Sequence, residues 1–222
     1  FNPFESIPGV SLRYVQYPSD LKQPDVIFLP GTKNTMDDLK WLRESGMEAL
    51  ILKAAASGTL IFGICGGYQM LGENLSDPHG VEAGGTMRGI GLLPVDTVFA
   101  EHKTRTQVCG KFLELDEEFA PLKNVEFTGY EIHMGESILK GEAGTATRIT
   151  DSVSGEKKEE GAFSGNVCGT YIHGIFDMEG VTDVIVKALA KKKGITLEKA
   201  SGMDLKSFKE EQYDKLADGI RS

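Results

Sequence analysis

The feature that most limits how this chain can fold is a cysteine that stands between a short apolar run and two glycines. Residues 60–64 form a continuous apolar run of the length of one buried strand. Cys65, Gly66 and Gly67 follow, and residues 68–72 have the composition of a short helix. A strand, a glycine-rich turn and a helix in this order form a nucleophile elbow, here with cysteine in place of serine. The segment therefore indicates an α/β fold with Cys65 at the end of a buried strand.

An earlier segment supplies a second strand and the helix that connects the two. Residues 25–29 are a short apolar run that predicts another buried strand. Asn34 or Thr35 can cap a helix whose apolar residues keep helical spacing over residues 39–54. Because a strand–helix–strand order gives a right-handed crossover between parallel strands, we expect a mostly parallel central sheet flanked by helices.

The middle of the chain has a different pattern. Residues 77–165 are rich in glycine and in short β-prone runs, at 94–100, 107–115 and 125–132. We interpret them as antiparallel strands and hairpins added to one edge of the sheet. The charged stretch 156–160 predicts an exposed turn.

The two flanks of the chain carry further predicted elements. Residues 11–17 alternate apolar and polar side chains, which is typical of a strand. The α/β pattern returns with a strand over residues 166–172 and a helix over 178–193, which Gly194 caps at its carboxyl end. A last amphipathic helix is predicted over residues 204–217.

Composition excludes several classes of function. The net charge is −9 and the pI about 5.0, so nucleic acid and anionic membranes are poor partners. Three cysteines without a Cys-x-x-Cys spacing argue against a disulfide framework and a zinc ribbon. A reducing cytoplasm is the simplest compartment for such a chain. No apolar run reaches the ~18 residues that a membrane-spanning helix needs.

Cys65 is the strongest candidate for a catalytic residue. A thiol at a helix N-terminus is expected to have a lowered pKa, because the helix dipole stabilises the thiolate. The backbone N–H of Gly66 points to where an oxyanion would form on a bound acyl group. The alternative is that Cys65 is one more buried small residue, as most free cysteines are. Cys109 and Cys168 lie in strand-like runs and are interpreted as structural.

A cysteine nucleophile for acyl transfer needs a base, usually a histidine. His173 follows a predicted strand and precedes Gly174, which places it at the carboxyl end of the sheet, where α/β folds keep their sites. His133 is the second candidate, although a lone histidine in a strand is more often structural. The histidine spacing does not indicate a metal site.

The loop after the first predicted strand, residues 30–34, can bring a second backbone N–H toward Cys65. With Gly66 this would complete an oxyanion hole. The alternative is an ordinary strand-to-helix turn.

These residues resemble a known family. Residues 63–69 are similar to the nucleophile motif of the class I, or triad, glutamine amidotransferases. More narrowly, the chain resembles the C-terminal glutaminase domain of the cobyric acid synthase family. Segments 29–35, 129–135 and 169–177 carry this closer match, and residues 1–4 resemble the junction between the two domains of those enzymes.

The resemblance implies a flavodoxin-like fold, with residues 1–10 as a linker from an upstream synthetase domain and 11–222 as the amidotransferase domain. It also implies that Gln69 and the backbone of Gly31 and Thr32 help to hold substrate glutamine. The ammonia released would serve the ATP-dependent amidation of corrinoid carboxylates in cobalamin biosynthesis.

The same resemblance assigns ATP and Mg²⁺ to the synthetase domain, and so implies no cofactor and no metal for this chain. The sequence itself contains no Gly-x-x-x-x-Gly-Lys-Ser/Thr loop that could cradle phosphates. The expected partners are therefore glutamine and a synthetase domain of the same polypeptide.

One position departs from the triad pattern. Most triad amidotransferases carry a glutamate two residues after the histidine, and Ile175 stands there in this chain. The cobyric acid synthase group resembles this chain in that respect. We expect a Cys–His dyad of Cys65 and His173, with Asp177 and Glu131 as candidate orienters of the imidazole.

Other functions share the same Cys–His machinery. They are the glutaminase domain of a cobyrinate a,c-diamide synthase, the glutaminase of a peptidoglycan-amidating complex and a γ-glutamyl hydrolase. A non-catalytic binding module is the alternative from another class. Lys33, Asn34 and Thr35 favour the cobyric acid synthase group, and the presence of both Cys65 and His173 speaks against a non-catalytic module.

Overall fold

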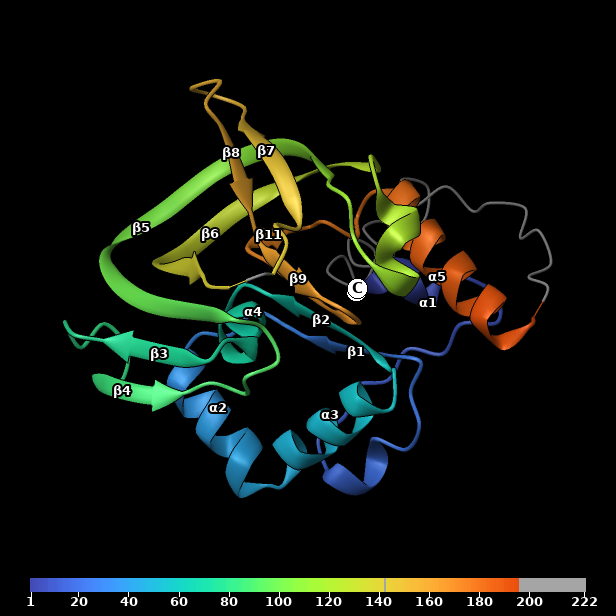
Figure 1. The fold of residues 1–222 in the computed structure, drawn as a ribbon, viewed down its shortest axis with the longest axis horizontal. Coiled ribbons are helices and arrows are strands. Elements are labelled where there is room, and N and C mark those ends of the chain that lie inside the picture. Colours follow the sequence, from blue (N-terminus) through green and yellow to red (C-terminus); the bar gives the residue numbers. More distant parts are fainter. Residues whose placement is uncertain (142, 196–222) are drawn as a thin grey trace, which may run out of the picture.

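A computed structural model describes residues 1–141 and 143–195 of the chain. Within this part, two β-sheets lie next to each other, and the α-helices are grouped around the smaller one (Figure 1). The smaller sheet has four strands in the order β1 (Val26–Leu29), β2 (Leu60–Ile64), β10 (Val167–Thr170) and β9 (Ala162–Ser164). The pairs β1–β2 and β2–β10 are parallel, and β9 is antiparallel to β10.

The larger sheet is built mainly from the middle of the chain. Its strand order is β11 (Ile172–His173), β6 (Glu126–Leu139), β5 (Val95–Phe112), β3 (Asn74–Asp77) and β4 (Gly85–Arg88). The hairpin of β7 (Thr147–Asp151) and β8 (Lys157–Glu160) joins β5 along a second edge. Pairing is antiparallel except between β3 and β5.

The predicted α/β class with added antiparallel strands is confirmed, but the arrangement of those strands differs. Only β9 extends an edge of the parallel sheet, whereas the others form a sheet of their own. The reason is the length of two strands, β5 and β6, which pair with each other along most of their course. β6 alternates buried and exposed side chains, as a strand with one covered face does.

The helices begin and end at recognisable signals. They are α1 (Asn2–Glu5), α2 (Thr35–Glu44), α3 (Met47–Ala56), α4 (Gly66–Leu71) and α5 (Glu179–Lys193), with short 3₁₀ helices η1 (Pro18–Asp20) and η2 (Glu117–Leu122). The Asn34 side chain caps α2 by accepting a hydrogen bond from Asp37 N–H at 3.0 Å, as predicted. Gly194, with a φ of 66°, ends α5. The single helix predicted after Asn34 is divided in two at Gly46, whose φ is 82°.

Two predictions about local structure were wrong. Residues 11–17 form no strand, because no neighbouring strand pairs with them in the described part of the chain. Residues 157–160 form strand β8 instead of an exposed turn, and Glu160 at its end is buried. The pairing of β8 with β7 supplies hydrogen bonds that the charge pattern does not reveal. The amphipathic helix predicted over 204–217 lies outside the described residues.

The N-terminal residues pack onto the core. Phe1 and Phe4 lie against Phe28 and Phe176, with ring centroids 5.0–5.8 Å apart. Phe4 is buried, so α1 forms part of the packed unit. The division between a linker over 1–10 and a domain from residue 11 stays a prediction. In the described part of the chain no helix is both long and apolar enough to cross a bilayer.

Candidate active site

Cys65 occupies a strained turn between β2 and α4. Its φ is 52° and its ψ −112°, a conformation that residues with a side chain rarely adopt. The backbone N–H of Cys65 donates to the Thr170 carbonyl at 2.8 Å, and its carbonyl accepts from Gln69 N–H at 2.9 Å. The turn has the strand–cysteine–helix geometry of the nucleophile elbow that the sequence predicts.

Two glycines allow the elbow to pack this closely. A Cβ at Gly63 would lie 2.7 Å from the backbone nitrogen of Tyr68, and one at Gly67 would lie 2.0 Å from the carbonyl oxygen of Leu29. Both distances are far below van der Waals contact. Helix α4 can therefore press against β1 and β2 only because these positions have no side chain.

His173 and Cys65 both lie against Gly31 and therefore close to each other. A Cβ placed on Gly31 would lie 3.0 Å from His173 Cε1 and 3.4 Å from the Cys65 Cβ. The three residues come from the end of β11, the elbow and the loop after β1. The structure thus brings together the three segments that the sequence singled out, at the carboxyl ends of β1 and β2.

Backbone groups surround the sulfur of Cys65. Gly66 hydrogen bonds to it through its N–H. The loop after β1 lies directly against this amide, since a Cβ on Gly66 would come within 3.1 Å of Thr32 N. Both halves of the predicted oxyanion hole, Gly66 and the Gly31–Thr32 loop, are therefore next to the thiol, and their role in catalysis remains a prediction.

The prediction that the pKa of the Cys65 thiol is lowered is wrong. Burial raises the pKa of Cys65 to about 11, and the Gly66 hydrogen bond only partly opposes this effect. Helix α4 has six residues, so its dipole is too small to outweigh the loss of solvent. The thiol donates to the Ile132 carbonyl at 3.4 Å, and within the described chain it has no hydrogen bond to His173.

The imidazole of His173 is suited to accept a proton. Burial lowers its pKa, against the raising effect of a hydrogen bond to the backbone of Ile132. Nε2 is buried and has no hydrogen-bond partner among the described residues. No described group therefore occupies this nitrogen, and it can act as a base.

The two pKa shifts predict how Cys65 reacts in the absence of glutamine. A neutral thiol beside a neutral imidazole should alkylate slowly at neutral pH. In a Cys109→Ser background, which removes the exposed cysteine, the iodoacetamide rate should rise about tenfold per pH unit between about pH 7 and about pH 9.5. A rate that is flat over this range would show a preformed thiolate–imidazolium pair instead.

Gln69 is buried beside the elbow and ties several loops together. Its Oε1 accepts from Thr35 Oγ1 at 2.9 Å, and its Nε2 donates to the Met134 carbonyl at 3.3 Å and to the Tyr171 hydroxyl at 3.2 Å. These bonds engage both ends of the amide. Gln69 therefore positions the walls of the site, and its predicted contact with substrate glutamine stays a prediction.

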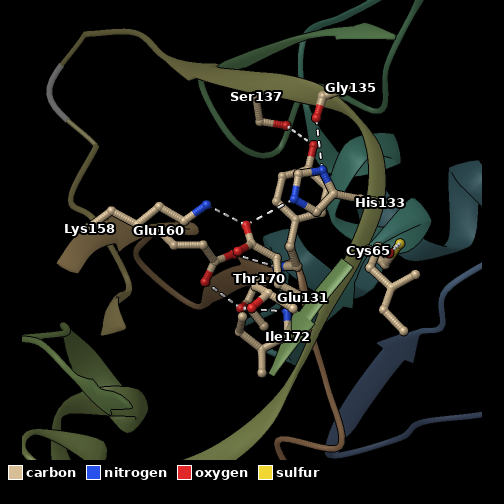
Figure 2. A network of polar contacts seen from close by, with 12 residues as sticks. Cys65, Glu131, His133, Gly135, Ser137, Lys158, Glu160, Thr170 and Ile172 are labelled. Atoms are coloured by element: carbon tan, nitrogen blue, oxygen red, sulfur yellow. Dashed lines mark hydrogen bonds and ion pairs between the residues drawn. The ribbon is translucent and has the colours of Figure 1, made fainter. Parts of the chain in front are cut away.

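His133 belongs to a buried network beside the site (Figure 2). Its Nε2 lies 2.9 Å from Glu131 Oε1 and its Nδ1 lies 2.8 Å from the Gly135 carbonyl. The ring stacks on Tyr171 with centroids 3.8 Å apart. These contacts agree with the structural interpretation of His133. Lys158 also donates to Glu131 Oε1, at 2.7 Å.

The two candidate orienters of His173 occupy different positions. Glu131 pairs with His133 and Lys158, and has no hydrogen bond to His173 in the described chain. Asp177 follows a tight turn in which Gly174 has a φ of 78° and Asp177 N–H donates to its carbonyl. The residue at the N-cap position of α5 is Met178.

Sequence reasoning missed several residues of the site. The Ile132 carbonyl gives no sequence signal, because every residue has one. Tyr171 could have been noticed as the polar aromatic two positions before His173, and Glu160 could not, since it lies in a run of exposed charges.

The elbow at Cys65 with a histidine beside it is the arrangement expected of a class I glutamine amidotransferase. The chain belongs to the family of CobB/CobQ-like glutamine amidotransferase domains, whose model matches residues 1–181.

Cobyric acid synthases are among the curated relatives that this chain matches. It is 50% identical to a cobyric acid synthase of Lachnoclostridium phytofermentans and 42% identical to one of Klebsiella pneumoniae, in each case over 100% of this chain. The chain spans 45% and 43% of the length of these relatives.

Solved structures share the fold. A crystal structure of a glutamine amidotransferase has a TM-score of 0.56 at 16% identity, covering 84% of this chain and 88% of its own. The structure of PurLQS from Thermotoga maritima has a TM-score of 0.55 at 19% identity, covering 82% of this chain and 85% of its own.

Proposed function

We propose that this chain hydrolyses glutamine to glutamate and ammonia through a thioester on Cys65. The observation that carries the proposal is that Cys65 and His173 both lie against Gly31. Cys65 also has a positive φ, a backbone conformation that is unfavourable for a residue with a side chain. A structural cysteine has no need of a positive φ, whereas a nucleophile on an elbow gains exposure to substrate from it.

The resting groups are neutral, so proton transfer accompanies the attack. His173 Nε2 takes the thiol proton as Sγ bonds to the carboxamide carbon of glutamine. Gly66 N–H and the Gly31–Thr32 loop stabilise the oxyanion. The imidazolium returns the proton to the departing ammonia, which leaves an acyl-enzyme thioester. His173 then activates water, which releases glutamate and restores the thiol.

The ammonia serves an ATP-dependent synthetase domain of the same polypeptide, which amidates corrinoid carboxylates in cobalamin biosynthesis. Support comes from the cobyric acid synthases, which are more than twice as long as this chain and match it over its whole length. The Lys33–Asn34–Thr35 sequence favours this assignment over a cobyrinate a,c-diamide synthase or a peptidoglycan-amidating complex.

A glutamine-analogue electrophile tests the glutaminase assignment. 6-Diazo-5-oxo-L-norleucine should form an adduct on Cys65, located by mass spectrometry of proteolytic fragments, and excess glutamine should slow the labelling. Wild-type protein should release glutamate from glutamine. An adduct on Cys109 or Cys168 with Cys65 unmodified would contradict the proposal.

We expect no ATP binding by this chain alone, because it has no phosphate-cradling loop. Titration calorimetry with ATP and Mg²⁺ should give no measurable heat of binding. Glutaminase activity should be weak until the synthetase domain is supplied. Tight, Mg²⁺-dependent ATP binding by residues 1–222 would contradict this expectation.

The dyad is tested by Asp177→Asn. Since the imidazole already has a hydrogen bond to the Ile132 backbone, the glutaminase rate should change less than about threefold, whereas an aspartate that orients a catalytic histidine is worth roughly 10⁴-fold. Glu131→Gln is the companion variant, and its effect should fall on stability through His133 and Lys158. A loss of rate by orders of magnitude in either variant, without unfolding, would identify a third catalytic group.

A further inference from the structure

The chain changes sheets immediately before His173. Thr170 is the last residue of β10 in the small sheet, and Ile172 is the first residue of β11 in the large one. Tyr171 lies between them and pairs with neither sheet. A buried backbone amide at such a crossing needs a partner from elsewhere.

Glu160 supplies that partner from the end of β8. Its Oε1 accepts a short hydrogen bond from Tyr171 N–H. Its Oε2 accepts from Thr170 Oγ1 at 2.7 Å and from Thr147 Oγ1 at 2.9 Å. Glu160 is 7% exposed and both threonines are 0% exposed, so these bonds are shielded from water. Figure 2 shows the carboxylate beside Thr170 and Ile172.

Thr170 connects this carboxylate to both catalytic residues. Its carbonyl accepts the N–H of Cys65 at 2.8 Å, and its Oγ1 accepts the N–H of Ile172 at 3.1 Å. Ile172 directly precedes His173. Thr170 therefore hydrogen bonds both to the amide of Cys65 and to the strand that carries His173, and Glu160 in turn hydrogen bonds to Thr170.

We propose that Glu160 is a positioning residue for glutamine hydrolysis, which sets the distance between Cys65 and His173 by fixing the crossing at Thr170 and Tyr171. The proposal rests on the glutaminase function proposed above. The carboxylate touches neither reacting atom and acts only through the backbone.

Two threonines on the same oxygen separate positioning from stability. Thr170→Val and Thr147→Val each remove one hydrogen bond to Glu160 Oε2, but only Thr170→Val also removes the acceptor of Ile172 N–H in the strand of His173. The backbone carbonyl that accepts Cys65 N–H is kept in both variants. Thr170→Val should lose more stability in denaturant unfolding, because it leaves a buried N–H without its acceptor, so rates are compared under conditions where both variants are folded. Thr170→Val should lower kcat for glutamine hydrolysis roughly 10- to 100-fold with KM nearly unchanged, and Thr147→Val less than about twofold.

Conservative variants give the rescue. Thr170→Ser keeps the hydroxyl and should restore kcat. Glu160→Gln keeps an acceptor for Tyr171 N–H and should retain far more activity than Glu160→Ala. Equal kcat values for folded Thr170→Val and Thr147→Val would overturn the proposal and leave Glu160 a purely stabilising residue.

A second readout needs no glutamine. Loosening the crossing should expose the Cys65 thiol, so Thr170→Val in the Cys109→Ser background should alkylate with iodoacetamide about threefold faster or more, while Thr147→Val should not. If wild-type protein released no glutamate, the proposed function would fail, and this alkylation rate would still decide whether Glu160 sets the position of Cys65. Identical rates in the two variants would overturn that role.

Discussion

Cys65→Ala should abolish glutamine hydrolysis while the protein stays folded. When catalytic residues act as a unit, removal of the nucleophile lowers the catalytic rate roughly 10⁵-fold or more. Alanine is close in size to cysteine and, like cysteine, has to adopt a φ of 52° at this position. The hydrogen bonds of the sulfur, from Gly66 N–H and to the Ile132 carbonyl, are weak, so stability should change little. Glutamate release and thermal unfolding of the same preparation measure the two effects.

The other cysteines provide matched controls. Cys109 is exposed on β5, and Cys109→Ala should change neither the rate of glutamine hydrolysis nor the thermal stability. Cys168 is fully buried in β10, so Cys168→Ala should cost stability with little effect on kcat. Residual glutaminase activity above about 1% in purified Cys65→Ala would assign the chemistry to another group.

Gly67→Ala should strongly destabilise the fold. The new Cβ would lie 2.0 Å from the carbonyl oxygen of Leu29 and 2.5 Å from the carbonyl carbon of the same residue. Leu29 belongs to β1, which is held in place by its pairing with β2. Helix α4 would have to move away from β1. We expect a loss of more than about 3 kcal/mol in the free energy of unfolding, measured in urea.

Gly180→Ala is the control for this substitution. It lies in α5 with its nearest neighbour at 3.6 Å, an ordinary contact, and its φ is not positive. Alanine should stabilise the helix there by up to about 1 kcal/mol. If Gly67→Ala unfolded at the same urea concentration as wild type, the close packing of α4 on β1 would be wrong.

The sequence by itself determined the elements whose signals are local. The apolar runs at residues 26–29 and 60–64, the glycines of the elbow and the Asn34 cap each depend on neighbours within a few positions, so their patterns could be interpreted directly. The same patterns indicated Cys65 and His173, since each was expected at the carboxyl end of a strand of one parallel sheet. Cys65 does follow β2 of that sheet, whereas His173 lies in β11 of the large sheet.

The tertiary structure decided what depends on residues far apart in the chain. It placed β5 and β6 in a sheet of their own, and turned a charged run into a strand that buries Glu160. It also reversed the expected pKa shift of Cys65, because burial comes from packing that a helix position does not specify. The carbonyl that holds His173 belongs to the backbone of Ile132, and backbone groups are the same in every sequence, so only folding selects which one reaches the imidazole.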